Sequence, residues 1–128
     1  MTEFYYNYSG RPYIPVNVTY NNQNLDLWAL VDSGADLCVS YRVIGEMFFG
    51  MKFPKETTNH IDGIDKKVFG WVIPVEIKFF DETFKIDVMW LKKKFDPTKN
   101  IQLILGRTPL FDKFDVEFRR NKTMIFRK

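Results

Sequence analysis

The sequence is poor in the residues that form covalent links and in the long apolar runs that span membranes. It holds one cysteine, Cys38, among 128 residues, which excludes a disulfide within the chain and removes any sign of an oxidising compartment. No apolar run approaches the ~18 residues that a transmembrane helix needs. The first residues, MTEFYYNYSG, lack the basic start and apolar stretch of a secretory signal. These absences predict a cytoplasmic protein without a membrane contact.

A strong excess of one sign of charge is also missing. The 19 basic and 16 acidic residues leave a net charge of +3, which is too balanced to indicate a nucleic-acid-binding protein. Lys92–Lys94 and Arg119–Arg120 form short basic runs, but no aromatic stacking platform or glycine-rich phosphate loop accompanies them. We therefore expect solvated loops at both places and no nucleic-acid partner.

Patterns that hold metals or cofactors are equally scarce. The segment Asp62–Asp65 contains two acids, but it lacks the ligand spacing of a calcium loop. The sequence therefore predicts neither a bound metal nor a cofactor.

The chain does contain many aromatic residues, and its strongest periodicity is two. Aromatics make up 17% of the chain and apolar residues 45%, which is enough for one domain with a substantial core. Alternation predicts a hairpin over residues 13–31, a second over 71–90 and a third over 114–126. Pro74 inside the second hairpin indicates an edge or bulge, and residues 101–105 are typical of a strand buried on both faces. The fold class is therefore mainly β.

Two short helices interrupt this pattern. Ser40 is a candidate N-cap for the first, and Gly50 is a candidate end. The second begins at Thr108-Pro109, a favourable pair for an N-cap and a first helical position. The apolar side predicted for the first helix consists of Val43, Ile44, Met47 and Phe48.

The segment that suggests chemistry runs from Ala29 to Asp36. An apolar strand leads directly into Asp32, Ser33 and Gly34, which carries a carboxylate to the end of a buried strand beside a tight turn. On these three residues alone, an ordinary turn between two strands is as plausible as a catalytic acid, because such a triplet occurs by chance in roughly 5% of chains of this length.

The surrounding motifs resemble those of the retropepsin-like aspartic proteases, the single-lobe relatives of pepsin. Leu30–Ala35 matches the family's strand and Asp-Ser/Thr-Gly-Ala motif, and Ile104–Arg107 matches its later apolar-apolar-Gly motif. Residues 110–116 resemble the helix and final hairpin of prokaryotic and retroelement members, and Arg11-Pro12 resembles the family's N-terminal Arg-Pro. The resemblance covers residues 11–126. It implies a single-lobe, closed β-barrel domain over 11–128, with residues 1–10 as an N-terminal extension.

The resemblance also implies an activity that needs two copies of the chain. Two carboxylates about 3 Å apart share one proton and activate a water molecule that attacks a peptide bond. Because the chain has one such motif, the second Asp32 must come from the partner in a C2 homodimer. The expected function is that of an aspartic endopeptidase acting on polypeptides. The alternative is a catalytically silent module that dimerises or binds peptides.

Further site residues follow from the same resemblance. Ser33 is implied to hydrogen-bond main chain of the opposite subunit, and Gly34 to permit the close turn. Ala35 and Asp36 are implied to contact substrate, together with Gly63 and Ile64 at the tip of a mobile flap. Support for the dimer and the site is assigned to Arg11, Gly106 and Arg107, with Asp36 paired to Arg107.

Overall fold

The computed structural model describes residues 2–5, 10–62, 65–79, 81–93 and 102–128. Within these ranges the chain forms ten strands and two short helices. In chain order they are β1 (Thr2–Tyr5), β2 (Tyr13–Tyr20), β3 (Gln23–Val31), β4 (Cys38–Tyr41), α1 (Arg42–Phe49), β5 (Asn59–Asp62), β6 (Lys67–Phe79), β7 (Glu82–Leu91), β8 (Leu103–Leu105), α2 (Arg107–Lys113), β9 (Asp115–Arg119) and β10 (Thr123–Arg127).

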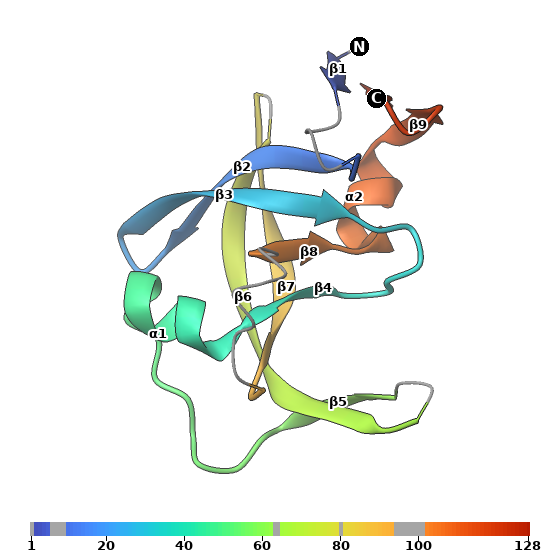
Figure 1. Cartoon of the computed structure of the whole chain (residues 1–128). Helices are drawn as coiled ribbons and strands as arrows, with labels where there is room; N and C mark the ends of the chain where they lie inside the picture. The colour runs from blue at the N-terminus through green and yellow to red at the C-terminus, as the bar shows by residue number, and fades with distance from the viewer. Residues whose placement is uncertain (1, 6–9, 63–64, 80, 94–101) are drawn as a thin grey trace.

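Six of the strands close into a barrel. The larger sheet has the order β2-β3-β8-β4-β7-β6-β5, and an additional β2–β6 pairing joins its ends around the core. Strand β5 continues beyond the barrel as a hairpin with β6, which leaves the body of the molecule at the bottom of Figure 1. Strands β1, β10 and β9 form a separate sheet near both termini, at the top of the same view. The predicted mainly β, closed single-lobe barrel is confirmed.

The core of the barrel comes from alternate residues of the strands, as the period of two predicts. In β2 the buried positions are Ile14, Val16 and Val18, and in β3 they are Leu27, Ala29 and Val31. Rings from the two sheets meet edge to face, with the centroids of Phe79 and Phe126 5.0 Å apart. The largest fully buried side chains are Trp90, Phe49, Phe79, Phe126, Ile14, Ile77, Ile86, Met89, Leu103, Leu105, Leu110 and Met124.

The hairpin predicted over residues 13–31 is present and turns at two asparagines. Strands β2 and β3 pair in register from Tyr13↔Leu30 to Tyr20↔Gln23. The two residues between them, Asn21 and Asn22, have φ angles of 46° and 65°. Turns with two left-handed residues match the twist of the strands, and asparagine tolerates this conformation better than most residues.

Pro74 occupies the edge-like position that the sequence predicts. Strand β6 (Lys67–Phe79) pairs with β7 from Gly70 to Phe79. Its other side pairs with β5 at residues 67–70 and with β2 at residues 76–78, so Pro74 lies between the two pairings. The missing N–H of proline therefore removes no ladder hydrogen bond on that side.

Helix α1 differs from the prediction in its start and in its buried face. Its N-cap is Tyr41, whereas the Ser40 hydroxyl donates to the carbonyl of Gln102 at 2.7 Å. The helix packs through Ile44, Gly45 and Phe49. The closest approach is made at Gly45, where a Cβ would lie 2.8 Å from Sδ of Met51 and 3.2 Å from the ring of Trp90. Met47 and Phe48 consequently stay 71% and 48% exposed. Gly50 ends the helix in the left-handed conformation, as predicted.

The remaining predictions for the C-terminal half hold in outline. Helix α2 is assigned from Arg107, and Thr108 keeps the extended angles φ −107° and ψ 127° before the helical residues. Strand β8 covers Leu103–Leu105, with Ile104 half-buried between two buried neighbours. Ile101, which was expected in the same strand, lies outside the described residues.

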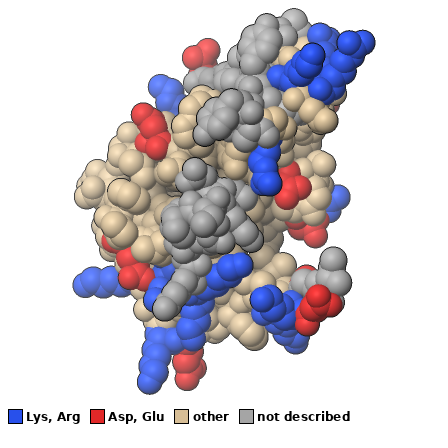
Figure 2. All heavy atoms as spheres, in the orientation of Figure 1, with Lys and Arg blue, Asp and Glu red and all other residues tan. Residues whose placement is uncertain are grey.

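The N-terminal extension contains a strand. Strand β1 pairs antiparallel with β10, from Thr2↔Phe126 to Tyr5↔Thr123. It adds a third strand to the β9–β10 hairpin, and the domain boundary at residue 11 stays a prediction. Charged side chains lie over the surface, and Lys and Arg gather at the end of the molecule where β9 lies (Figure 2).

Candidate functional site

Asp32 follows directly after β3, at the point where this strand meets β8. The backbone N–H of Asp32 donates to the carbonyl of Leu105 at 3.0 Å, and that of Val31 donates to the carbonyl of Pro12 at 3.0 Å. The strand end is therefore held from both sides. Because Leu27, Ala29 and Val31 face the core, Leu30 and Asp32 face away from it. The Asp32 side chain is half-buried.

A tight turn after β3 orients the carboxylate. The N–H of Gly34 donates to Oδ1 of Asp32 at 2.8 Å, and the N–H of Ala35 donates to the Asp32 carbonyl at 3.2 Å. Ser33 and Gly34 are exposed. The carboxylate thus accepts one backbone hydrogen bond and keeps one face available to a ligand.

Gly106 brings the second motif against this turn. A Cβ on Gly106 would lie 2.4 Å from the carbonyl oxygen of Leu37 and 2.7 Å from that of Ala35. Only glycine permits such an approach of two backbones. The N–H of Arg107 then donates to the Ala35 carbonyl at 2.8 Å. The two motifs, far apart in the sequence, form one unit.

The strand order explains why the two motifs meet. Strand β8 lies between β3 and β4, parallel to β3 (Leu30↔Ile104) and antiparallel to β4 (Val39↔Ile104). The segment from Asp32 to Leu37, which connects β3 to β4, must therefore cross the end of β8. Gly106 is the residue over which it crosses.

Asp36 and Arg107 form the ion pair expected from the resemblance. Nη2 of Arg107 contacts Oδ1 of Asp36, and both side chains are exposed in the single chain. An exposed pair of this kind is worth about 0–1 kcal/mol. Arg11 is also exposed, next to Pro12, whose carbonyl holds the end of β3. The roles of Arg11 and Arg107 in a dimer stay predictions.

Apolar side chains border the carboxylate on its own face of the sheet. Leu30 and Ile104 are neighbours in the parallel register, and Ile104 is also opposite Val39. All three are half-buried rather than covered by the core. Sequence reasoning missed Leu37, an apolar residue that is 43% exposed in the Asp32 loop. The available signal was its position directly after Asp36.

The predicted flap coincides with the β5–β6 hairpin. Its paired part runs from Asn59↔Gly70 to Asp62↔Lys67, and His60 packs its ring 6.1 Å from that of Phe69 across the strands. His60 is therefore a residue of the hairpin stem. Gly63 and Ile64, which were predicted to contact substrate, lie outside the described residues.

Cys38 begins β4 and belongs to the core rather than to the site. Its side chain is fully buried, and Sγ lies 3.6 Å from the carbonyl oxygen of Thr108. Burial raises the pKa of the thiol, since a thiolate would lose its hydration there. The thiol therefore stays neutral and acts as a small apolar residue.

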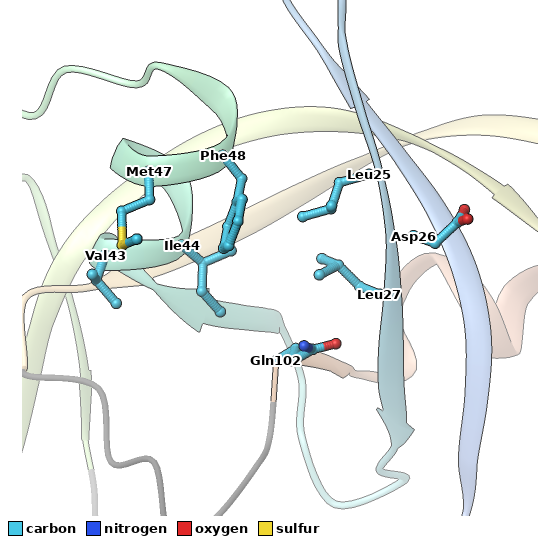
Figure 3. A pocket seen from close by; sticks show the side chains of 8 residues that line it. All are labelled: Leu25, Asp26, Leu27, Val43, Ile44, Met47, Phe48 and Gln102. Atoms are coloured by element: carbon cyan, nitrogen blue, oxygen red, sulfur yellow. The ribbon is translucent and has the colours of Figure 1, made fainter.

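A separate apolar cavity lies on the other side of β3, against α1 (Figure 3). Its volume is about 410 Å³, and it contains none of the predicted site residues. Leu25 and Leu27 of β3 point toward Phe48 of α1 there, whereas Asp26 points away (Figure 3). Because no polar groups converge on it, we locate the candidate active site at Asp32 instead.

Two absences concern only the part of the chain that the structure describes. No three histidine, cysteine, aspartate or glutamate side chains gather there in a group that could hold a metal ion. Neither helix in these ranges has the length and apolar character needed to cross a membrane.

The closed barrel, the crossing loop and the position of Asp32 define a single-lobe retropepsin-like protein. A solved structure of EIAV protease, complexed with the inhibitor HBY-793, superposes with a TM-score of 0.58 at 26% identity and covers 84% of this chain and 92% of that chain. A retropepsin-like aspartic protease from Rickettsia conorii superposes with a TM-score of 0.67 at 18% identity, covering 96% and 89%. The resemblance predicted from the motifs is thereby confirmed. No protein-family model and no curated protein sequence matches the chain.

Proposed function

We propose that this protein is an aspartic endopeptidase that acts as a homodimer. The observation that carries the proposal is the Asp32 carboxylate, oriented by the N–H of Gly34 at the end of a barrel strand in a retropepsin-like fold. The EIAV neighbour, a protease complexed with an inhibitor, supports the assignment to peptide hydrolysis. No cofactor takes part in this proposal.

The need for a dimer follows from the chemistry. A lone carboxylate can accept a proton from water, but it cannot at the same time donate one to the substrate carbonyl. Each chain supplies one Asp-Ser-Gly motif, at Asp32–Gly34. A twofold axis between the two Asp32 loops places the same acid of both chains face to face. At about 3 Å the two carboxylates share one proton, which is the arrangement known from pepsin-like enzymes.

The proposed reaction needs only these two acids and water. The ionised carboxylate removes a proton from the water as its oxygen attacks the peptide carbonyl carbon, and the protonated carboxyl gives its proton to the carbonyl oxygen. The tetrahedral intermediate then breaks its C–N bond, and a proton returns to the departing amine. Ser33 and Gly34 hold the loop, and Arg107 braces it through Asp36 and Ala35.

The substrate in this proposal is an extended polypeptide with apolar residues at the cleavage site. Leu30 and Ile104 offer an apolar surface beside Asp32, and Leu37 extends it along the loop. The β5–β6 hairpin is a candidate lid that excludes water while the peptide adds to it as a strand. We place Ala35, Asp36, Gly63 and Ile64 among the contacts of the bound peptide.

The decisive experiment compares the wild type with Asp32→Asn on a denatured protein and a peptide library between about pH 3 and 7. We expect cleavage by the wild type alone, inhibition by pepstatin-like compounds and sedimentation as a dimer. Asp81→Asn is a matched control, since it makes the same substitution at an exposed acid outside the Asp32 loop. Equal products from wild type and Asp32→Asn would reveal a contaminant. No products from either would favour the silent peptide-binding module.

A further inference from the structure

The outer face of the β2–β3 hairpin carries an exposed aromatic ring. Trp28 is 54% exposed, whereas the other two tryptophans, Trp71 and Trp90, are 2% and 1% exposed. The indole Nε1 of each buried tryptophan donates to a backbone carbonyl, whereas that of Trp28 has no acceptor among the described residues. Trp28 points outward because its neighbours Leu27 and Ala29 face the core. Its ring and its N–H are therefore accessible to a ligand.

A network of polar side chains lies beside this ring. Asp26 is on the same face of β3 as Trp28, about 7 Å away along the strand. Nδ2 of Asn17 donates to Oδ1 of Asp26 and to Oδ1 of Asn24, both at 2.8 Å. Nδ2 of Asn24 donates in return to Oδ1 of Asn17 at 2.6 Å and to Oγ1 of Thr19 at 2.8 Å. These side chains hold one another in place, so a ligand that binds them has little ordering entropy to lose.

The network leaves one acceptor and one donor of opposite charge for a ligand. Asp26 accepts from Asn17 on Oδ1, and its Oδ2 has no donor among the described residues. Lys78 of β6 lies opposite Asn17 in the β2–β6 pairing and is exposed. Lys78 forms no ion pair within the described ranges. The carboxylate and the ammonium are thus both accessible from solvent.

These groups line one shallow concavity on the outer side of the barrel. Its volume is about 400 Å³, and Trp28, Asp26, Asn17 and Lys78 all border it. It is distinct from the apolar cavity against α1, since Asp26 points away from that cavity (Figure 3). Asp32 follows Trp28 by four residues, about 13 Å along the strand, and does not line the concavity. The concavity is therefore separate from the candidate active site.

We propose that this concavity binds a neutral saccharide, with one sugar ring stacked on Trp28 and its hydroxyls bonded to Asp26 and Lys78. A hydroxyl both donates and accepts, so neighbouring hydroxyls of one sugar can satisfy a carboxylate and an ammonium together. An indole presents an apolar ring with one polar N–H. This matches a sugar ring, which has apolar C–H groups on its faces and hydroxyls at its edge.

The charges and the apolar area argue against other occupants. A cationic ligand over Trp28 would be repelled by Lys78, and an anionic ligand would be repelled by Asp26. A second copy of the chain would need a wide apolar contact, because a stable interface buries about 800 Å² on each partner. Here Trp28 and Pro15, its partner in the ladder, are the exposed apolar residues that border the concavity. The face is therefore suited to a small, uncharged ligand.

The first test is tryptophan fluorescence of the full-length protein, quenched with acrylamide and titrated with cellohexaose. Because Trp71 and Trp90 are buried, the quenched signal comes mainly from Trp28. Cellohexaose is the probe because its glucose rings carry equatorial hydroxyls, which leave flat C–H faces. We expect it to protect Trp28 from quenching and to give saturable binding by calorimetry. Sorbitol, which has the hydroxyls without a ring, should do neither.

Variants measured by calorimetry assign the binding to individual side chains. Trp28→Ala should weaken cellohexaose binding at least 10-fold, whereas Trp28→Phe, which keeps a ring, should restore most of the affinity. Asp26→Ala should weaken binding about 10-fold, because a hydrogen bond to a charged acceptor is lost. Phe48→Ala is the matched control, since it removes a ring of similar exposure, 48%, from α1. It should bind like the wild type.

Three results would overturn the proposal. The first is no protection and no binding at about 10 mM cellohexaose. The second is equal weakening by Phe48→Ala and Trp28→Ala. The third is tighter binding of a hexalysine peptide, which would assign the face to a cationic polypeptide.

Asp32→Asn separates this proposal from the proposed protease activity. We expect this variant to bind cellohexaose like the wild type, because Asp32 does not border the concavity. A loss of binding in Asp32→Asn would place the saccharide at the candidate active site and overturn the proposed location. The measurement uses no peptide substrate, so its result is independent of the test for peptide hydrolysis.

Discussion

Gly106 shows how one missing side chain determines the geometry of the site. The carbonyls of Leu37 and Ala35 pass over it within 2.4 Å and 2.7 Å of the position that a Cβ would take. Asp32, Asp36 and Arg107 are arranged around this crossing, so their relative positions depend on a contact between backbones. Side chains elsewhere in the loop can vary without moving it.

We therefore expect Gly106→Ala to lower the free energy of unfolding by about 2 kcal/mol, because the backbone must move apart to admit the methyl group. Gly34→Ala is the matched control. Its Cβ would meet only Oδ1 of Asp32, at 3.2 Å, so it should cost clearly less. Chemical denaturation of both variants measures the difference. Equal stability of the two would mean that the close crossing does not persist in solution.

At the scale of elements, the strands and the end of α1 at Gly50 were predictable, whereas the start of α1 was not. Alternation located β2, β3, β6 and β7 because a strand with one buried face must repeat every two residues. The start of α1 was wrong because Ser40 finds a better partner in the Gln102 carbonyl, contributed by a distant part of the chain. Its predicted apolar side was right for Ile44, which is buried, and for Val43, which packs against the core. It was wrong for Met47 and Phe48, because the helix approaches Trp90 through Gly45, and glycine carries no hydrophobic signal in a sequence.

The residues of the candidate site that belong to short sequence motifs could be predicted. The exposure of single side chains could not. Asp32–Gly34 and Gly106–Arg107 could be located because each motif lies next to an apolar strand, and their ion pair followed from the resemblance. The exposure of Leu37 and Phe118 depends on which neighbours the fold brings near them. No sequence pattern within a few residues of either position predicts whether its side chain is exposed.

The turn between β2 and β3 supplies a prediction about an element. Both of its residues are left-handed, with Asn22 at φ 65°, and glycine is favoured at the second position of such a turn. Asn22→Gly should raise the free energy of unfolding by about 0.5 kcal/mol, whereas Asn22→Val should lower it by about 1–2 kcal/mol. Thermal unfolding of the two variants measures both changes. A destabilising Asn22→Gly would contradict the turn geometry.

At the scale of the whole molecule, the shared active site that we propose predicts that activity depends on pairs of chains. If wild type is mixed with a ninefold excess of Asp32→Asn and allowed to exchange partners, only about a tenth of the wild-type chains stay in dimers with two intact acids. We expect activity to fall to about a tenth of that of wild type mixed with an inert protein. The wild-type rate of peptide cleavage, followed after mixing, measures the loss. Unchanged activity would mean that a single chain is sufficient.

The hydrogen bond from the N–H of Asp32 to the carbonyl of Leu105 can form only after Leu105 has been synthesised. The candidate site is therefore completed late in relation to Asp32 itself. Asp32 is synthesised before β8, which braces it, and before Gly106, which lies under its loop. A nascent chain that stops before residue 103 therefore contains Asp32 but lacks the strand β8 that holds it in position. Folding must also wait for this distant pairing, which favours slow barrel closure. In the protease that we propose, the active site therefore forms only after residues 103–106 have been made.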